Sequence, residues 1–458
     1  MKLIYQVEDK PKFGQLIVFA IQQLLAIMTA TLVVPVITGH GMSSAAALFG
    51  AGVGTLIYVL FTAKKSPVFL GSSFAFLGSM AAAFAGATTG EIVNTELGYF
   101  GLIIGAAAAG LVYVLIALIV KFAGVAWVDK LMPAVVIGPT VAIIGLSLAG
   151  NAVGDLTNGG LKVDGQSVAD PKVALLCGLF ALFITMICSV FGKKLGKMIP
   201  FIFGILAGYA LSLIFTIIAL LTGNESLHVI DFSHFTALVE GGVSLKTFFA
   251  VPSFTFLTAF KGLSSVNGSY ITTILAAYVP VAMVVFAEHI ADHKNISSII
   301  ERDLLKDPGL SRTLLGDGVG SMVGAFFGGC PNTTYGESIG CVAITKNASV
   351  YTIIAAAVGA IIISFLSPFI AFVNSIPSCV MGGICMALYG FIAVSGLKMV
   401  QGVDLNKNKN LFVVSVILIS GIGGLTISFG TVNITSVACA LILGILTNLL
   451  LHDAPEEE

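Results

Sequence analysis

The chain has 458 residues, of which 57% are hydrophobic and only 10% are charged, and its formal net charge is −1. Because soluble globular proteins carry about 25% charged residues, this composition excludes a soluble domain and predicts an all-α polytopic membrane protein in a lipid bilayer. The nearly neutral charge gives no indication of a nucleic-acid partner. The seven cysteines lie in apolar surroundings without metal-ligand spacing, so we interpret them as small buried side chains and expect no metal site.

Apolar segments that could cross a bilayer recur along the chain. The fourteen predicted spans are residues 14–38, 43–62, 67–86, 98–121, 131–150, 172–192, 199–221, 274–292, 313–329, 331–345, 350–373, 377–397, 410–430 and 432–451. The first follows a lysine-containing leader directly and is expected to be a retained helix rather than a signal peptide. Spans 67–86 and 331–345 contain VFLGSSFAF and PNTTYGESIG, which are rich in Gly, Ser, Thr and Pro. We expect these two spans to be broken, with extended backbone that protein groups or a water cavity satisfy.

The distribution of Lys and Arg supports this count. With the N-terminus inside and fourteen spans, all of the 22 basic residues except Lys162, Lys172, Lys246 and Lys261 fall in cytoplasmic segments. Cytoplasmic loops carry an excess of Lys and Arg, and removing one span in mid-chain would invert every later loop and spoil the asymmetry. We therefore expect both termini to be cytoplasmic.

Two short patterns recur in the sequence. P-x-x-V-x-G occurs at Pro133 and again at Pro377, and a weaker G-x-S-apolar pattern occurs at Gly71 and at Gly336 in the broken spans. Together they pair the fifth span with the twelfth and the third with the tenth, a displacement of seven spans. Because seven is odd, the second copy must cross the membrane in the opposite direction. An inverted repeat with broken segments in matching places is typical of a transporter whose site lies at the bilayer midplane.

Two carboxylates lie in or beside apolar spans. Glu288 is near the end of a long apolar run, and Glu337 is in the second broken span. An ionisable side chain at membrane depth costs about 2.5–3.5 kcal/mol on insertion scales and by default marks a substrate or ion path. Glu288 and Asp292 are four residues apart on one helix face, where two carboxylates are not both ionised at low cost. We expect one of them to hold a proton for coupling, the alternative being a structural carboxylate paired with a nearby lysine.

Other polar groups are expected to be structural. His289 is predicted to be a packed core histidine, and His293 is predicted to lie at the membrane interface. Residues 151–171 are expected to form a turn-rich loop, and residues 222–273 to contain short interfacial helices with aromatic anchors. The charges of residues 294–318 are expected to form a solvated face of an amphipathic stretch.

The broken spans are predicted to present main-chain donors to a ligand. Gly336 precedes Glu337 in one of them, and Ser73 and Phe74 lie in the other. A carboxylate accepts hydrogen bonds while nearby N–H groups donate them, so a neutral, planar ligand with alternating N–H and C=O groups would match this array. The ring of Phe74 or Tyr335 would offer a stacking surface. The alternative is that Gly and Ser in these segments only permit tight packing.

Three stretches resemble a known family. AEHIADH, DLLKDPGLSRTLLGDG and especially PNTTYGESIGCVAITK resemble the nucleobase–ascorbate transporter family (nucleobase/cation symporter-2), and within it bacterial uracil permeases. The resemblance extends over nearly the whole chain, including TLVVPVI in the first span and MGGICMALYG in the twelfth. It implies fourteen spans in two inverted seven-span repeats, with short strands in spans 3 and 10. It also implies a core domain (14–122 and 274–373) that holds the substrate, a gate domain (131–221 and 377–451), and a homodimer.

The resemblance also implies residue roles. Glu288 and Glu337 would bind the nucleobase, main-chain N–H groups at Phe74 and around Gly336 would donate to it, and Tyr335 and Tyr389 would lie beside it. The sequence departs from the family pattern at three places: Ser338 replaces Asn, Gln22-Gln23 replaces Gln-His, and Asp292 stands where some proton-coupled members have His. Asp292 can still carry a proton, and its presence in place of His leaves sodium coupling open as an alternative.

We therefore expect no enzyme and no cofactor, but a symporter of the bacterial plasma (inner) membrane that imports uracil with a proton. Glu288 would bind the uracil edge, and its proton state would be coupled through Asp292. The alternatives are a purine permease for xanthine or urate, and sodium-coupled nucleobase uptake. A carboxylate or anion transporter is disfavoured because the acids cluster and no mid-membrane Lys or Arg is present. A channel or a structural membrane protein would need no paired inverted broken spans.

Overall fold

The computed structural model describes residues 3–163, 166–193, 195–429 and 432–451. Within them, eight helical segments are long and apolar enough to cross a membrane: α1 (Phe13–Thr38), α2 (Ser44–Phe61), α4 (Thr95–Ala123), α6 (Ala134–Ser147) with α7 (Ala149–Asp155), α8 (Pro171–Phe191), α10 (Pro200–Thr222), α14 (Gly268–Ile300) and α19 (Ser378–Val400). They lie within or over eight of the predicted spans, and they make the chain a multi-pass membrane protein.

The remaining predicted spans are shorter or less apolar elements. Four shorter apolar segments are η1 (Phe74–Phe76) with α3 (Leu77–Gly86), α17 (Val350–Ile363), α20 (Asn408–Ile422) and α21 (Ser436–Leu450). The helices that overlap the predicted spans 313–329, 331–345 and 350–373 also include α15 (Leu310–Gly328), α16 (Gly336–Thr345) and α18 (Ser367–Asn374). By length and composition alone the structure supports eight spans, so the total of fourteen stays a prediction.

The expected breaks in spans 3 and 10 are present. The strands β1 (Leu70–Ser72) and β6 (Asn332–Thr334) replace helix there, and each leads within two residues into a helix start. They pair antiparallel with one another, with Gly71 opposite Thr333. All six strand residues are buried. Each strand therefore satisfies its ladder hydrogen bonds with the other, although they lie more than 250 residues apart in the sequence.

The repeated sequence patterns have different structural outcomes. Pro133 and Pro377 each immediately precede a helix, α6 and α19, with extended backbone, and these two helices pack against one another. The G-x-S-apolar match is wrong in register, because Gly71 lies within β1 whereas Gly336 is the first residue of α16. In that part of the structure Phe74, the first residue of η1, is the counterpart of Gly336.

The connecting segments contain short elements. These are β2 (Thr88–Thr89), β3 (Ile92–Val93), α5 (Ala126–Leu131), β4 (Lys162–Val163), β5 (Gln166–Ser167), α9 (Leu195–Met198), η2 (Glu225–Leu227), α11 (Ser233–Val239), α12 (Leu245–Phe248), α13 (Thr255–Ala259), η3 (Phe260–Ser265), η4 (Leu305–Gly309), β7 (Ile427–Phe429) and β8 (Val432–Ile434). The expected turn-rich loop is thus the end of α7 with the β4–β5 hairpin. The prediction that the charges of residues 294–318 form a solvated face is wrong for Asp317, which is fully buried in α15.

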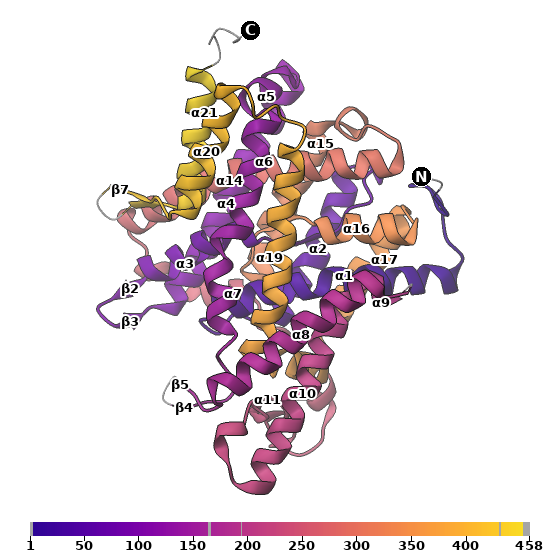
Figure 1. Cartoon of the computed structure of the whole chain (residues 1–458), viewed down its shortest axis with the longest axis vertical. Helices are drawn as coiled ribbons and strands as arrows, with labels where there is room; N and C mark the ends of the chain where they lie inside the picture. Colours follow the sequence, from indigo (N-terminus) through magenta and orange to yellow (C-terminus); the bar gives the residue numbers. More distant parts are fainter. Residues whose placement is uncertain (1–2, 164–165, 194, 430–431, 452–458) are drawn as a thin grey trace.

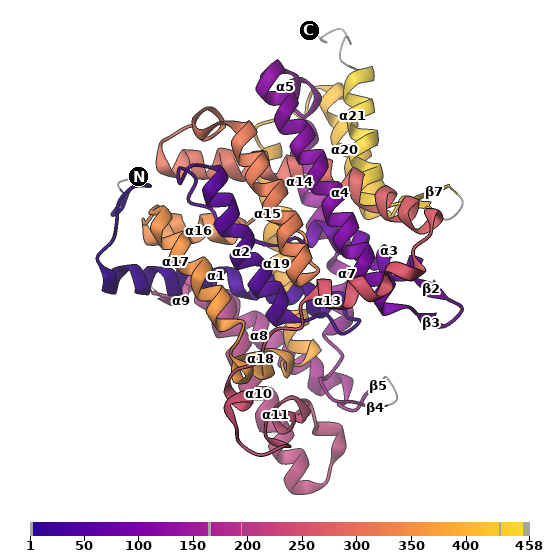
Figure 2. The ribbon, with the colours of Figure 1, turned by 180° about the vertical axis from the view of Figure 1, so that it is seen from behind.

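The helices form two neighbouring groups. α15 packs against α2 and α4, and α14 packs against α3 and α4. α19 packs against α6 and α8, and α8 packs against α10. In Figures 1 and 2, α8, α10 and α11 form one end of the molecule, and α19 lies between this end and α20–α21. The second broken span lies close to where the groups meet, since α14 contacts β6 and α16 and also contacts α6 of the other group.

An N-terminal strap, defined as residues 3–9, runs beside the segment that follows α16. Ile4 N donates to Lys346 O at 2.7 Å, and Ala348 N and Val350 N each donate to the strap at 3.0 Å. Glu8 pairs with Arg302, which lies just beyond the end of α14. The strap therefore joins the ends of the two helices that carry Glu288 and Glu337.

Candidate functional site

A cavity of about 740 Å³ lies between the broken spans, α14 and α19, within the size range typical of small-molecule sites. Its lining residues are Leu25, Ala26, Phe74, Val141, Ser189, Lys197, Ile199, Pro200, Phe201, Glu288, Ala291, Asp292, Lys294, Asn295, Thr333, Tyr335, Gly336, Glu337, Gly340, Cys341, Ile344, Phe391, Ile392, Val394, Ser395, Lys398 and Met399. The three carboxylates Glu288, Asp292 and Glu337 therefore share one cavity, although they come from two separate parts of the chain.

Helix α14 supplies two of these carboxylates. Glu288 and Asp292 are one helical turn apart, and both line the cavity, as the i, i+4 spacing predicts. Thr334 Oγ1 donates a hydrogen bond of 2.7 Å to Asp292 Oδ2. Since Thr334 belongs to β6, the second broken span fixes the position of a carboxylate on α14.

The two helix starts supply main-chain donors. η1 begins at Phe74, with one residue between it and the end of β1, and α16 begins at Gly336, with one residue between it and the end of β6. The first N–H groups of a helix have no partner within the helix, and the helix dipole makes this end positive. Phe74, Gly336 and Glu337 all line the cavity. The site thus combines carboxylate acceptors with N–H donors, which suits a small neutral ligand that carries both N–H and C=O groups.

Tyr335 is held in place by the strand pair. Its hydroxyl donates to the carbonyl oxygen of Ser72 at 2.6 Å, and its side chain is 4% exposed. A Cβ at Gly71 would lie 2.4 Å from the Tyr335 ring, so only glycine permits this close approach. The ring therefore forms a rigid wall between the strand pair and the cavity.

Two predicted site residues lie behind the cavity surface. The N–H of Ser73 donates to the carbonyl oxygen of Pro331 at 2.9 Å, so it is already occupied. Tyr389 lies behind Phe74, with the two rings edge to face at 5.5 Å. Neither residue lines the cavity, whereas Phe74, Tyr335, Gly336, Glu337, Glu288 and Asp292 all do.

A buried polar group that was not predicted lies next to the site. Asp317 Oδ2 lies 2.7 Å from His289 Nδ1, and His289 Nε2 lies 3.0 Å from Thr313 Oγ1. All three side chains are fully buried. His289 is therefore the satisfied core histidine that was predicted. Asp317 could have been found from the sequence, because a carboxylate among the glycines of an apolar span is itself a functional indication.

His293 was placed wrongly. It was expected at the interface, but it is fully buried, with its ring stacked 4.0 Å from that of His289. Its Nδ1 donates to the carbonyl oxygen of His289 at 2.8 Å, and its Nε2 lies 2.7 Å from the hydroxyl of Tyr58. The hydroxyl of Tyr58 in turn donates to Ser66 at 2.7 Å. Long-range partners of this kind explain the burial, and no local sequence pattern reports them.

Two of the departures from the family pattern contact each other. Gln23 Nε2 donates to the hydroxyl oxygen of Ser338, which also accepts a hydrogen bond of 3.0 Å from the Phe69 N–H. Gln23 and Ser338 are buried, and the pair joins α1 to the first turn of α16. Gln23, which stands in place of His, thus contacts Ser338, which stands in place of Asn. Ser338 immediately follows Glu337 in the sequence.

Comparisons with known proteins identify the family of the chain. A family model described as a permease family matches residues 14–429. The chain is 38% identical to a uracil permease of Bacillus caldolyticus, over 99% of this chain and 96% of that protein. It is 37% identical to a uracil permease of Bacillus subtilis (strain 168), with the same coverage of both chains, and 35% identical to one of Escherichia coli (strain K12), over 97% and 93%.

Solved structures of similar shape are transporters with little sequence identity. The transmembrane domain of the cyanobacterial bicarbonate transporter BicA superposes with a TM-score of 0.60 at 15% identity, covering 97% of this chain and 99% of that one. The murine Solute Carrier 26 family member A9 anion transporter, in its inward-facing state, superposes with a TM-score of 0.66 at 9% identity, covering 97% and 69%. At these identities the likeness concerns the fold alone.

Proposed function

The chain belongs to the permease family whose model it matches, the nucleobase–ascorbate transporters, and from this premise we propose that it imports uracil together with a proton. It is a membrane transporter and not an enzyme. The observation that carries the substrate assignment is the single cavity shared by Glu288, Glu337 and the two helix starts, taken with the uracil permeases among its relatives.

Uracil is neutral and planar, and its ring edge alternates N–H and C=O groups. Glu288 accepts a hydrogen bond from a ring N–H, and Glu337 completes the acceptor set on the α16 side. The N–H groups at Phe74 and Gly336 donate to the ring carbonyl oxygens, and the rings of Phe74 and Tyr335 cover its faces. Hydrogen bonds to charged groups contribute about 1.5–3 kcal/mol each, enough to select a polar planar ligand over an apolar one.

The coupling ion is assigned to the α14 carboxylates. Because uracil carries no charge, any charge that moves belongs to the ion. Glu288 and Asp292 lie one turn apart in one cavity, and a proton shared by this pair relieves the repulsion between two carboxylates. The hydrogen bond from Thr334 orients Asp292 for this exchange. Sodium is the alternative ion.

Transport is proposed to occur by alternating access in a fold of fourteen spans, arranged as two inverted seven-span repeats. The core domain (14–122 and 274–373) would move against the gate domain (131–221 and 377–451). The pairing of β1 with β6 and the mutual packing of α6 and α19 support this assignment, since each joins corresponding parts of the two proposed repeats. The similarity to transporter folds supports it as well.

The proposed location is the bacterial inner membrane, with both termini cytoplasmic. The excess of Lys and Arg in the predicted cytoplasmic segments supports this orientation. A homodimer is proposed from family membership.

The test uses purified protein in liposomes with an imposed inward pH gradient. Uptake of labelled uracil is measured for the wild type and for Glu288→Gln, with and without a protonophore, and in the presence of excess unlabelled xanthine. We expect the protonophore and the substitution each to abolish uptake, and xanthine to leave it unchanged. Glu225→Gln, at an exposed carboxylate of η2, is the matched control.

The other outcomes are informative. Uracil uptake that is unchanged by the protonophore but requires sodium contradicts the assignment of the proton as the coupling ion. Strong uptake of xanthine without uptake of uracil assigns the protein to the purine permeases of the family.

A further inference from the structure

Three lysines line the same cavity as the three carboxylates, and because their side chains are exposed we take them to mark its mouth and the half-buried carboxylates to mark its base. Lys197, Lys294 and Lys398 come from α9, α14 and α19. All three side chains are exposed, whereas the carboxylates at the base are only partly exposed. The cavity lining therefore contains two kinds of charge, half-buried carboxylates and exposed ammonium groups. A neutral nucleobase carries no negative charge that could pair with these ammonium groups.

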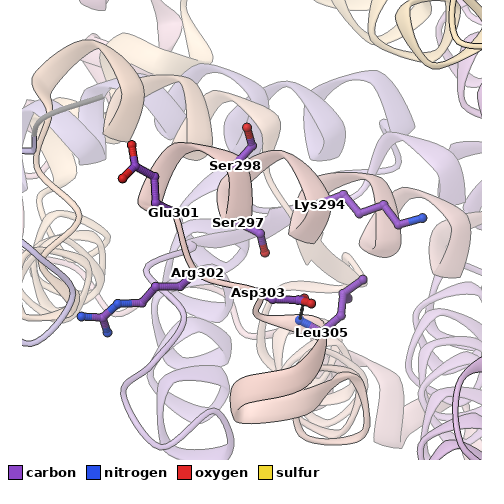
Figure 3. Close-up of a pocket in the computed structure, with 7 residues that line it drawn as sticks. All are labelled: Lys294, Ser297, Ser298, Glu301, Arg302, Asp303 and Leu305. Atoms are coloured by element: carbon purple, nitrogen blue, oxygen red, sulfur yellow. Dashed lines mark hydrogen bonds between the residues drawn. The ribbon is translucent and has the colours of Figure 1, made fainter.

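These lysines have no acidic partner among the residues that the structure describes. Elsewhere on the same chain, exposed cations do pair, as Lys65 does with Asp307 at 2.6 Å and Lys306 with Asp303 at 3.3 Å. Lys294 also lines a shallow pocket of about 390 Å³ that contains Glu301 and Asp303. Figure 3 shows that its ammonium group points away from both of these carboxylates. The positive charge at the mouth is thus left uncompensated.

The mouth also carries neutral hydrogen-bond donors. Asn295 follows Lys294 on α14, Ser395 lies one turn before Lys398 on α19, and Ser189 lies near the end of α8. Apart from the three carboxylates at the base, no Asp or Glu lines the cavity in the described part of the chain. Several ammonium groups together with hydroxyl and amide donors form a combination that binds phosphate oxygens.

We propose that this mouth binds a phosphate group, namely that of a pyrimidine nucleoside monophosphate whose base reaches Glu288 and Glu337. This inference rests on the proposed uracil site, because the base must be recognised there. A cavity of about 740 Å³ is much larger than a single nucleobase requires. The phosphate would bridge α14 to α9 and α19 and so hold the cavity open. The nucleotide would then compete with uracil without being carried.

Anionic lipid headgroups are the other source of phosphate, because lysines near a membrane surface also attract them. Two features favour the soluble ligand. The lysines line the same cavity as the nucleobase carboxylates, and they come from three different elements.

The test is calorimetric titration of the purified full chain in lipid-free detergent with uracil, uridine and uridine 5′-monophosphate. We expect the monophosphate to bind, to compete with uracil and to bind more tightly than uridine. Replacing Lys197, Lys294 and Lys398 together by Gln should weaken binding of the monophosphate roughly tenfold, since each exposed ion pair contributes little alone. The same variant should change uracil binding far less. A control variant replaces Lys12, Lys121 and Lys130, which lie outside the cavity.

A second arm adds phosphatidylglycerol to the detergent micelles or to phosphatidylcholine vesicles. Monophosphate binding that persists in both supports the soluble ligand. Phosphatidylglycerol that binds through the three lysines while the monophosphate does not bind overturns the proposal in favour of lipid. Uracil binding without monophosphate binding overturns the proposal and leaves uracil transport standing. Absence of uracil binding refutes the proposed function. If the monophosphate still binds in that case, competition with inorganic phosphate tests the lysines: inorganic phosphate that displaces the monophosphate as well as unlabelled monophosphate does shows that the lysines alone bind it.

Discussion

Thr334 Oγ1 donates a hydrogen bond of 2.7 Å to Asp292 Oδ2, so a strand residue of one broken span holds a carboxylate one turn beyond Glu288 on α14. This contact is the direct link between the two parts of the site, because β6 leads through Tyr335 into Gly336 and Glu337. A ligand that moves α16 would therefore change the surroundings of Asp292.

Removing this hydroxyl should impair coupling more than binding. We expect Thr334→Val to lower proton-driven uracil uptake roughly tenfold, because a hydrogen bond to a charged group contributes about 1.5–3 kcal/mol. Uracil affinity in detergent should change by less than the uptake rate does. Thr334→Ser keeps the donor and is the control. Equal loss in both variants would show that the methyl group, not the hydroxyl, matters.

The two glutamates should be required for binding itself. Glu288→Gln and Glu337→Gln should each weaken uracil binding about 10–100-fold, since each substitution removes a charged acceptor. Calorimetric titration measures the affinity, and thermal denaturation in detergent verifies that the variants are folded. Glu225→Gln serves again as the control. Wild-type affinity in the Glu337 variant would remove that residue from the site.

Gly71 and Gly336 should respond differently to a methyl group. In Gly71→Ala the new Cβ would lie 2.4 Å from the Tyr335 ring, so we expect a loss of about 1–3 kcal/mol in unfolding free energy and a lower Tm. Nothing lies within 4 Å of the corresponding position at Gly336, so Gly336→Ala should keep its Tm but reduce uracil affinity by entering the cavity. A reduced Tm in both variants would contradict the assignment of Gly336 to an open site wall.

The buried pair of His289 and Asp317 should behave as a unit. His289→Leu or Asp317→Leu leaves one polar group buried without its partner, which costs about 3–5 kcal/mol of stability. The double variant should lose less unfolding free energy than the two single variants lose together, because replacing both partners also removes the cost of burying the polar groups. A double-mutant cycle of Tm values measures this coupling. Additive losses would show that the 2.7 Å contact contributes nothing specific.

The N-terminal strap should loosen in acid. The hydrogen bond from the Arg302 guanidinium lowers the pKa of Glu8 below its ordinary value of 4.5. A lowered pKa means that the pair stabilises the strap above the unfolded pKa and that this contribution is lost as the pH falls through the folded pKa. Because the pair is largely exposed, it contributes less than about 1 kcal/mol.

Glu8→Gln should therefore raise the proteolysis rate of the strap modestly at pH 7. The variant and the wild type should converge at acidic pH, below the folded pKa of Glu8. Asp9→Asn provides a neighbouring carboxylate control that does not contact Arg302 by an ion pair in the described residues. A difference between Glu8→Gln and the wild type that persists in acid would contradict the pairing.

The sequence by itself determined the class of this protein and the identity of its main polar groups. Its composition required a membrane, since so few charges cannot solvate a soluble surface of this size. Gly, Ser and Pro in 67–86 and 331–345 made regular helix unfavourable, and the strands β1 and β6 lie there. Glu288 and Asp292 share a face because of helical spacing, which is a local property.

Only the tertiary structure decided which distant groups meet. The burial of Asp317 and His293, the contact of Gln23 with Ser338, and the occupied N–H of Ser73 all depend on partners far away in the sequence. The match of Gly71 with Gly336 likewise fails, because Gly71 lies within the strand β1 whereas Gly336 begins the helix α16. Local patterns report periodicity and propensity, whereas hydrogen-bond satisfaction in a low-dielectric interior is decided by whichever groups the fold brings within reach.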